Sequence, residues 1–187
     1  MRKARILLAI ALATASAVLN CNSGYVPVGT YTETAAADER DCDQERRRAE
    51  ARGLELLKSL EGLRLTAYHD VTAYRIGYGT PAAHAQERIT VDEADQRVRA
   101  RYLRECAYMR TAHPHLTEPQ IAALAVMRFN VGSFGPGLRR AVATGAPEQI
   151  AAQMSRYVKS AGEVLPGLRS RREAEIELLF ADNSNLS

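Results

Sequence analysis

A change of hydrophobic period next to Glu61 constrains the fold more than any other feature of this sequence. Four leucines shortly before this residue fall at helical spacings and Gly62 follows it, so a long helix is predicted to end there. Residues 63–68 then alternate between apolar and polar side chains, which is the period of a half-buried strand. A turn at residues 70–73 and a second strand at 74–79 complete the pattern. The sequence therefore predicts a helix followed directly by a β-hairpin.

The rest of the chain is predicted to be helical. Thr90 and Glu93 match a capping box that begins a helix of about twenty residues. Thr117 and Pro119 begin another helix. The apolar stripe of this second helix consists of Ile121, Leu124, Ala125 and Phe129. Three shorter helices are predicted at residues 138–143, 147–157 and 168–180. The expected fold class is α+β, with a small hairpin lobe joined by a long helix to a mainly α-helical lobe.

The length of 187 residues allows one compact domain with an N-terminal extension. We expect an export signal or signal-anchor at 1–21, a linker at 22–45 and a folded domain at 46–187. The net charge is +3, and basic and acidic residues interleave instead of forming a basic tract. This charge pattern argues against a nucleic-acid partner, and a monomer is expected.

The N-terminus resembles a secretory signal. Arg2, Lys3 and Arg5 precede an apolar run at residues 6–19. This run is shorter than the roughly 20 residues that span a bilayer. Cleavage near 15–17, lipidation at Cys21 and later release of an uncleaved anchor all remain open. We expect an exported protein of the periplasm or host cell envelope, with transient inner-membrane association through residues 6–19.

Cysteine and histidine spacing gives no support for a metal site or a cofactor. If Cys21 is removed or lipidated, Cys42 and Cys106 remain as a possible disulfide, which an oxidising compartment would permit. The sequence has no C-x-x-C pattern, and its histidines lack the spacing of paired metal ligands. We interpret the histidines as surface residues. They are His69, His84, His113 and His115.

Two carboxylates are candidates for acid and base chemistry. Glu61 is expected at the negative end of a helix dipole, where ionisation is disfavoured, and this suits a general acid. Asp70 lies in the hairpin turn, which would bring it back towards the end of that helix. Two carboxylates in different environments facing one cleft could protonate a glycosidic oxygen and activate water.

Three blocks of sequence resemble the phage-type lysozymes, glycoside hydrolase family twenty-four. EGLRLTAYHDVTAYRIGYG at 61–79 is similar to the family's catalytic signature. LTEPQIAAL followed by FNVG at 129–132 is similar to its central helix, and LPGLRSRREAE at 165–175 to its C-terminal segment. The blocks occur in the family's order over about residues 50–181. The resemblance implies a lysozyme-like α+β fold.

The resemblance also implies hydrolysis of the β-1,4 bond between N-acetylmuramic acid and N-acetylglucosamine in peptidoglycan, with no cofactor. Glu61 would be the general acid, and Asp70 would position or deprotonate water, which leads to inversion. Phe129 and Asn130 are candidates for sugar contacts; a core aromatic and a helix cap are equally good interpretations. We interpret the ion-forming residues of the third block as a helix surface with a structural role. They are Arg171, Arg172 and Glu175.

The catalytic block departs from the family's pattern at Arg75, which stands where a catalytic Thr is usual. Thr72 could supply the hydroxyl, or Arg75 could stabilise Asp70 as a carboxylate. Alternatively, the domain has lost activity and only binds peptidoglycan. The enzyme, whether for host lysis, wall remodelling or attack on rival bacteria, would be favoured if Arg75 points into the cleft and pairs with Asp70 while leaving Glu61 free. The binding module would be favoured if Arg75 fills the sugar site or pairs with Glu61.

Overall fold

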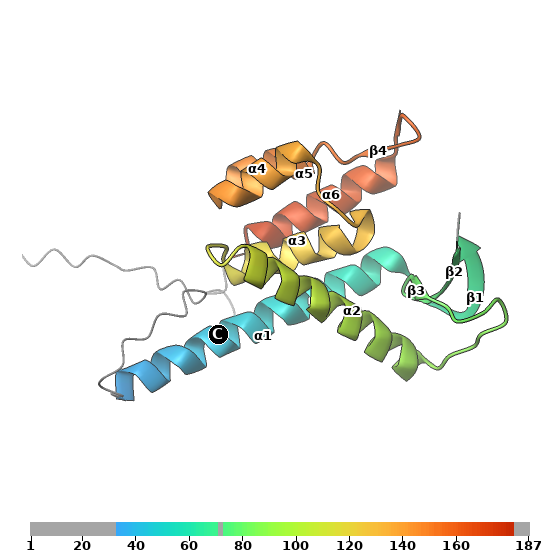
Figure 1. Ribbon diagram of the computed structural model, residues 1–187, viewed down its shortest axis with the longest axis horizontal. Coiled ribbons are helices and arrows are strands. Elements are labelled where there is room, and N and C mark those ends of the chain that lie inside the picture. Colours follow the sequence, from blue (N-terminus) through green and yellow to red (C-terminus); the bar gives the residue numbers. More distant parts are fainter. Residues whose placement is uncertain (1–32, 71–72, 182–187) are drawn as a thin grey trace, which may run out of the picture.

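The computed structural model describes residues 33–70 and 73–181, and Figure 1 shows their arrangement. The helical elements are α1 (Glu33–Glu61), α2 (Val91–Ala112), α3 (Glu118–Val131), α4 (Pro136–Thr144), α5 (Pro147–Met154) and α6 (Pro166–Leu179). The strands are β1 (Arg64–Asp70), β2 (Ala73–Gly77), β3 (Thr80–Pro81), β4 (Lys159–Ser160) and β5 (Glu163–Val164). The predicted α+β class is confirmed, with the sheet β1-β2-β3 at one end of the helices.

Helix α3 forms the centre of the helical lobe. It packs against α1, α2 and α6, so nearly all of its side chains are buried. The predicted apolar stripe is confirmed, because each of its four members, Ile121, Leu124, Ala125 and Phe129, is buried. The stripe underestimates the burial of α3, since a helix with neighbours on three sides exposes little of its surface to solvent.

Capping interactions fix where the two central helices begin. The Thr90 hydroxyl accepts a hydrogen bond from the backbone N–H of Glu93, whose carboxylate accepts one from the backbone N–H of Thr90. This is the capping box that the sequence predicts. Thr117 and Gln120 form the same arrangement at the start of α3. Both helices thus begin where local sequence directs.

The small lobe has three strands, one more than predicted. Strands β1 and β2 pair antiparallel with Tyr68 opposite Arg75, and β3 pairs with the other edge of β2. The predicted second strand ends at Gly77, since that residue and Gly79 adopt positive φ and turn the chain into β3. The expected half-burial of β1 is largely wrong, because Leu65 is 38% exposed.

Other expectations differ from the structure at specific places. The segment expected as a linker at 22–45 is helical from Glu33 onward, as the first part of α1. The loop expected before α6 contains the small β4–β5 hairpin. Cys106 is a free thiol, fully buried on α2, so the disulfide considered possible between Cys42 and Cys106 is not formed. Within residues 33–70 and 73–181, no helix has both the length and the apolar character needed to cross a bilayer.

Candidate active site

Glu61 is the last residue of α1, and its side chain is 18% exposed. The loop between β2 and β3 lies directly against it. A Cβ atom built on Gly79 would lie 3.2 Å from Glu61 Oε2, and Gly79 adopts a φ of +75°. Glycine is favoured here for two reasons, the left-handed backbone and the close approach to the carboxylate. The helix end and the loop together give Glu61 a partly enclosed position.

Arg171 of α6 forms an ion pair with Glu61. The two residues are 110 positions apart in the sequence. Arg171 also bonds through Nε to Glu175 Oε1 at 3.3 Å, and Arg172 Nη2 reaches the same oxygen at 2.9 Å. These side chains are buried: Arg171 is 8% exposed, Arg172 1% and Glu175 0%. The interpretation of this group as a helix surface is therefore wrong. The family resemblance included the segment at 165–175, but the sequence could not show that Arg171 of this segment contacts Glu61.

One guanidinium is thus shared between two carboxylates. Desolvation raises the pKa of Glu175 to about 7, against the opposing effect of Arg172 and Arg171. Because Arg171 faces both Glu175 and Glu61, its charge does not belong to either carboxylate alone. The sequence predicts that the dipole of α1 acts on Glu61; the structure adds the guanidinium of Arg171 beside the same carboxylate.

Asp70 ends β1, and its partner is Arg75 of β2. Arg75 faces Tyr68 in the strand register, so Asp70, two residues further along β1, lies on the same face of the hairpin. Arg75 Nε is 3.9 Å from Asp70 Oδ2, with Asp70 53% and Arg75 32% exposed. No ion pair between Arg75 and Glu61 exists in the described parts of the chain. Thr72, the other candidate for a third member, lies outside the described residues.

The two candidate sugar contacts lie in different surroundings. Phe129 is 5% exposed, and the guanidinium carbon of Arg101 is 3.6 Å from its ring centroid, which leaves little of the ring for a ligand. Asn130 is exposed at the end of α3, and its Oδ1 accepts a hydrogen bond from Arg172 Nη2 at 3.0 Å. Asn130 is therefore connected to Glu61 through Arg172, Glu175 and Arg171.

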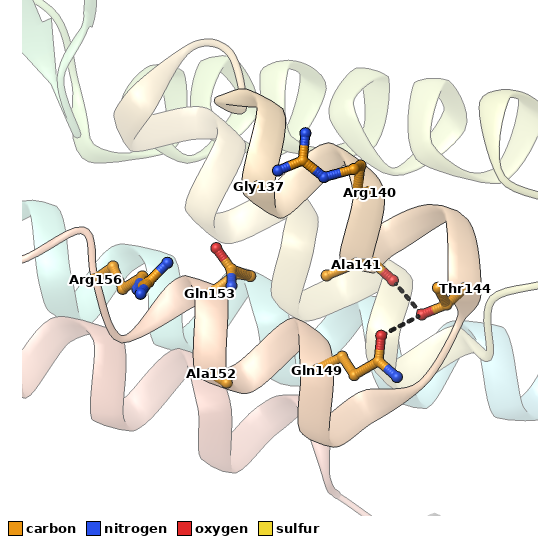
Figure 2. A pocket seen from close by; sticks show the side chains of 8 residues that line it. All are labelled: Gly137, Arg140, Ala141, Thr144, Gln149, Ala152, Gln153 and Arg156. Atoms are coloured by element: carbon orange, nitrogen blue, oxygen red, sulfur yellow. Dashed lines mark hydrogen bonds between the residues drawn. The ribbon is translucent and has the colours of Figure 1, made fainter.

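The described residues contain no group of three or more metal-ligating side chains. A groove of about 360 Å³ lies between α4 and α5, and none of the predicted site residues lines it. Figure 2 shows Arg140, Arg156 and the amides of Gln149 and Gln153 around this groove, with the Thr144 hydroxyl held by Ala141 and Gln149. The groove is thus separate from Glu61.

Two phage endolysins are similar to this chain in sequence. The chain is 32% identical over 145 residues to the endolysin of Lactococcus phage c2, which covers 71% of this chain and 62% of that protein. It is 33% identical over 132 residues to the endolysin of Bacillus phage PZA, covering 66% of this chain and 51% of that one. The chain thus spans only about half to three fifths of these relatives.

Solved structures give a fuller match. The muramidase domain of SpmX from Asticaccaulis excentricus superposes with a TM-score of 0.63 at 31% identity, covering 70% of this chain and 95% of that domain. The active form of P1 phage endolysin Lyz has a TM-score of 0.59 at 20% identity, covering 68% of this chain and 82% of that one, which supports the fold. The sequence model of the protein family described as phage lysozyme matches residues 58–175 of this chain. This segment includes Glu61, Asp70 and Arg171. The chain therefore belongs to the phage lysozyme family.

Proposed function

We propose that this protein is an endo-acting muramidase that hydrolyses the β-1,4 bond between N-acetylmuramic acid and N-acetylglucosamine in bacterial peptidoglycan. Membership of the phage lysozyme family supports hydrolysis of peptidoglycan as the class of activity. The similarity to a muramidase domain over 95% of its length supports the choice of bond. Cell lysis or wall remodelling would use the same chemistry.

In the proposed reaction, Glu61 donates its proton to the glycosidic oxygen as the bond from that oxygen to the anomeric carbon breaks. Water attacks the anomeric carbon from the opposite face, and Asp70 orients it and accepts its proton. The products are a hemiacetal of inverted configuration and a free hydroxyl on the leaving sugar. Arg171 stabilises the carboxylate that Glu61 becomes after the transfer.

The observation that carries this proposal is the separate pairing of the two carboxylates. Arg75, which replaces the usual Thr, contacts Asp70 and leaves Glu61 to Arg171. The substitution therefore adds a cation beside the residue that would act on water. It does not neutralise the proposed acid.

A peptidoglycan-binding module without activity is the second candidate. The absence of the usual Thr at position 75 favours it, because the family's pattern has three catalytic members. Asn130 is exposed and fixed by Arg172, so a polar contact to a glycan would remain even without hydrolysis.

The decisive experiment compares the full-length chain with Glu61→Gln on purified Gram-negative peptidoglycan. We expect the wild type to lower the turbidity and the variant not to. Glu55→Gln is the matched control, because Glu55 is an exposed residue of the same helix and should leave activity unchanged. If neither the wild type nor the variant lowers turbidity while both sediment with the sacculi, the protein is the binding module.

Export to the compartment that contains the wall is a second part of the proposal. It rests on the basic and apolar character of residues 1–19, which lie outside the described residues. Fractionation of expressing cells should recover the chain from the periplasm or membrane, and deletion of residues 2–19 should retain it in the cytoplasm.

A further inference from the structure

Arg101 of α2 connects the small lobe to the helical lobe. Its Nη1 donates to the carbonyl oxygen of Gly79 at 3.3 Å, and its Nη2 donates to the carbonyl oxygen of Phe129 at 2.9 Å. The guanidinium also stacks on the Phe129 ring at 3.6 Å. The partners are 22 and 28 positions away along the chain, so one side chain fixes the β2–β3 loop against the end of α3.

The acceptors of Arg101 are carbonyl oxygens, and no carboxylate of the described residues lies within ion-pair distance of it. Burial lowers the pKa of Arg101. The charges of Glu105 and Glu61 raise this pKa, and the charge of Arg75 lowers it. Glu105 itself bonds to Arg128 at 2.7 Å. Among the described residues, no direct ion pair holds this half-buried cation. The directions of its two hydrogen bonds are what it contributes.

Gly79 is the link from Arg101 to Glu61. The backbone of Gly79 approaches the Glu61 carboxylate so closely that a Cβ atom would lie 3.2 Å from Oε2. A shift of this loop would therefore change the surroundings of Oε2 directly. The same loop continues from β2, whose Arg75 pairs with Asp70.

We propose that Arg101 is a positioning residue, which acts through Gly79 to hold the hairpin lobe, and with it Asp70, in a fixed relation to Glu61. This inference rests on the proposed muramidase function. Its effect on rate follows from geometry, because a displacement of about 1 Å between reacting groups can cost about a hundredfold in rate.

The test compares Arg101→Lys and Arg101→Met with Arg104→Lys, an exposed residue of the same helix. Lysine keeps the charge but presents a single ammonium, which cannot span two carbonyl oxygens in the geometry of a planar fork. We expect Arg101→Lys to lower kcat about tenfold or more while KM changes less than about threefold. Arg104→Lys should match the wild type in both constants. The proposal would be overturned if KM of Arg101→Lys rose by as large a factor as kcat fell, or if kcat were unchanged.

A second readout does not depend on hydrolysis. In NMR spectra of the folded protein, the Gly79 amide and the Glu61 side-chain carboxyl signals should both move in Arg101→Lys and stay in place in Arg104→Lys. Unmoved signals in Arg101→Lys would refute the link through Gly79, whatever the activity. A wild type without hydrolysis but with these shifts would refute the muramidase and leave the positioning contact intact.

Discussion

Arg171 donates a hydrogen bond to Glu61 and, through its Nε, a second one to Glu175, so one guanidinium faces a carboxylate of its own helix, α6, and the carboxylate at the end of α1. Arg171 is 8% exposed and Glu175 is fully buried. The candidate general acid is thus part of a buried charge network and does not stand alone at a helix end.

Replacement of Arg171 by Met should lower kcat by about tenfold or more, because the carboxylate left after proton transfer loses its stabilising charge. The rate of glycan hydrolysis should be measured at a temperature where circular dichroism shows the variant to be folded. Arg169→Met is the control, since Arg169 is exposed on the same helix. A rate equal to the wild type in Arg171→Met would remove Arg171 from the site.

Replacement of Arg75 by Met should separate stability from activity. The pair with Asp70 is exposed and 3.9 Å long, so the free energy of unfolding should change by less than about 0.5 kcal/mol. Hydrolysis should fall severalfold, because Asp70 loses the cation beside it. Arg75→Thr, which restores the residue type usual in the family, tests whether a hydroxyl serves better. An increase in rate in Arg75→Met would show that Arg75 obstructs the site.

The contribution of Glu175 to the stability of the protein should fall as the pH rises from about 5 to about 7. Burial raises the pKa of Glu175 from 4.5 to about 7, so the folded state holds this proton more tightly than the unfolded state. The contribution of Glu175 to the free energy of unfolding is complete below pH 4.5 and is lost as the pH rises through 7. Its upper limit is on the order of 3 kcal/mol.

Glu175→Gln should flatten this dependence in urea unfolding measured at several pH values. The difference between wild type and variant isolates Glu175, since both share His113, whose lowered pKa acts in the opposite sense in part of the same range. The carboxylates with lowered pKa, such as Glu93, act below this window. Parallel curves for the two proteins would contradict the assignment.

Gly53→Ala should destabilise the protein although alanine favours helix. A Cβ atom at Gly53 would lie 1.9 Å from Oη of Tyr102, which is fully buried and cannot move aside freely. We expect a net loss of about 1–3 kcal/mol in the free energy of unfolding. Gly167→Ala in α6 is the control, because nothing lies within 4 Å of the added atom there, and it should be neutral or slightly stabilising. Equal stability of both variants would show that Tyr102 adapts.

Local features of the fold could be predicted because they depend on neighbouring residues. The capping box at Thr90 and the apolar stripe on α3 are set within one or two helical turns. The third strand and the burial of Arg172 depend on which segments meet, so hydrophobic period could not reveal them.

The sequence alone determined the α+β class, the end of α1 at Glu61 and the likeness of its three blocks to phage lysozymes. Hydrogen bonds, turns and periodicity within a few residues are sufficient for these. The pairing of Arg171 with Glu61, the pairing of Arg75 with Asp70 and the hydrogen bond from Arg101 to Gly79 follow from tertiary packing and could not be read from the sequence. A charged side chain interacts with whichever partner packing brings near, and packing joins segments as far as 110 residues apart.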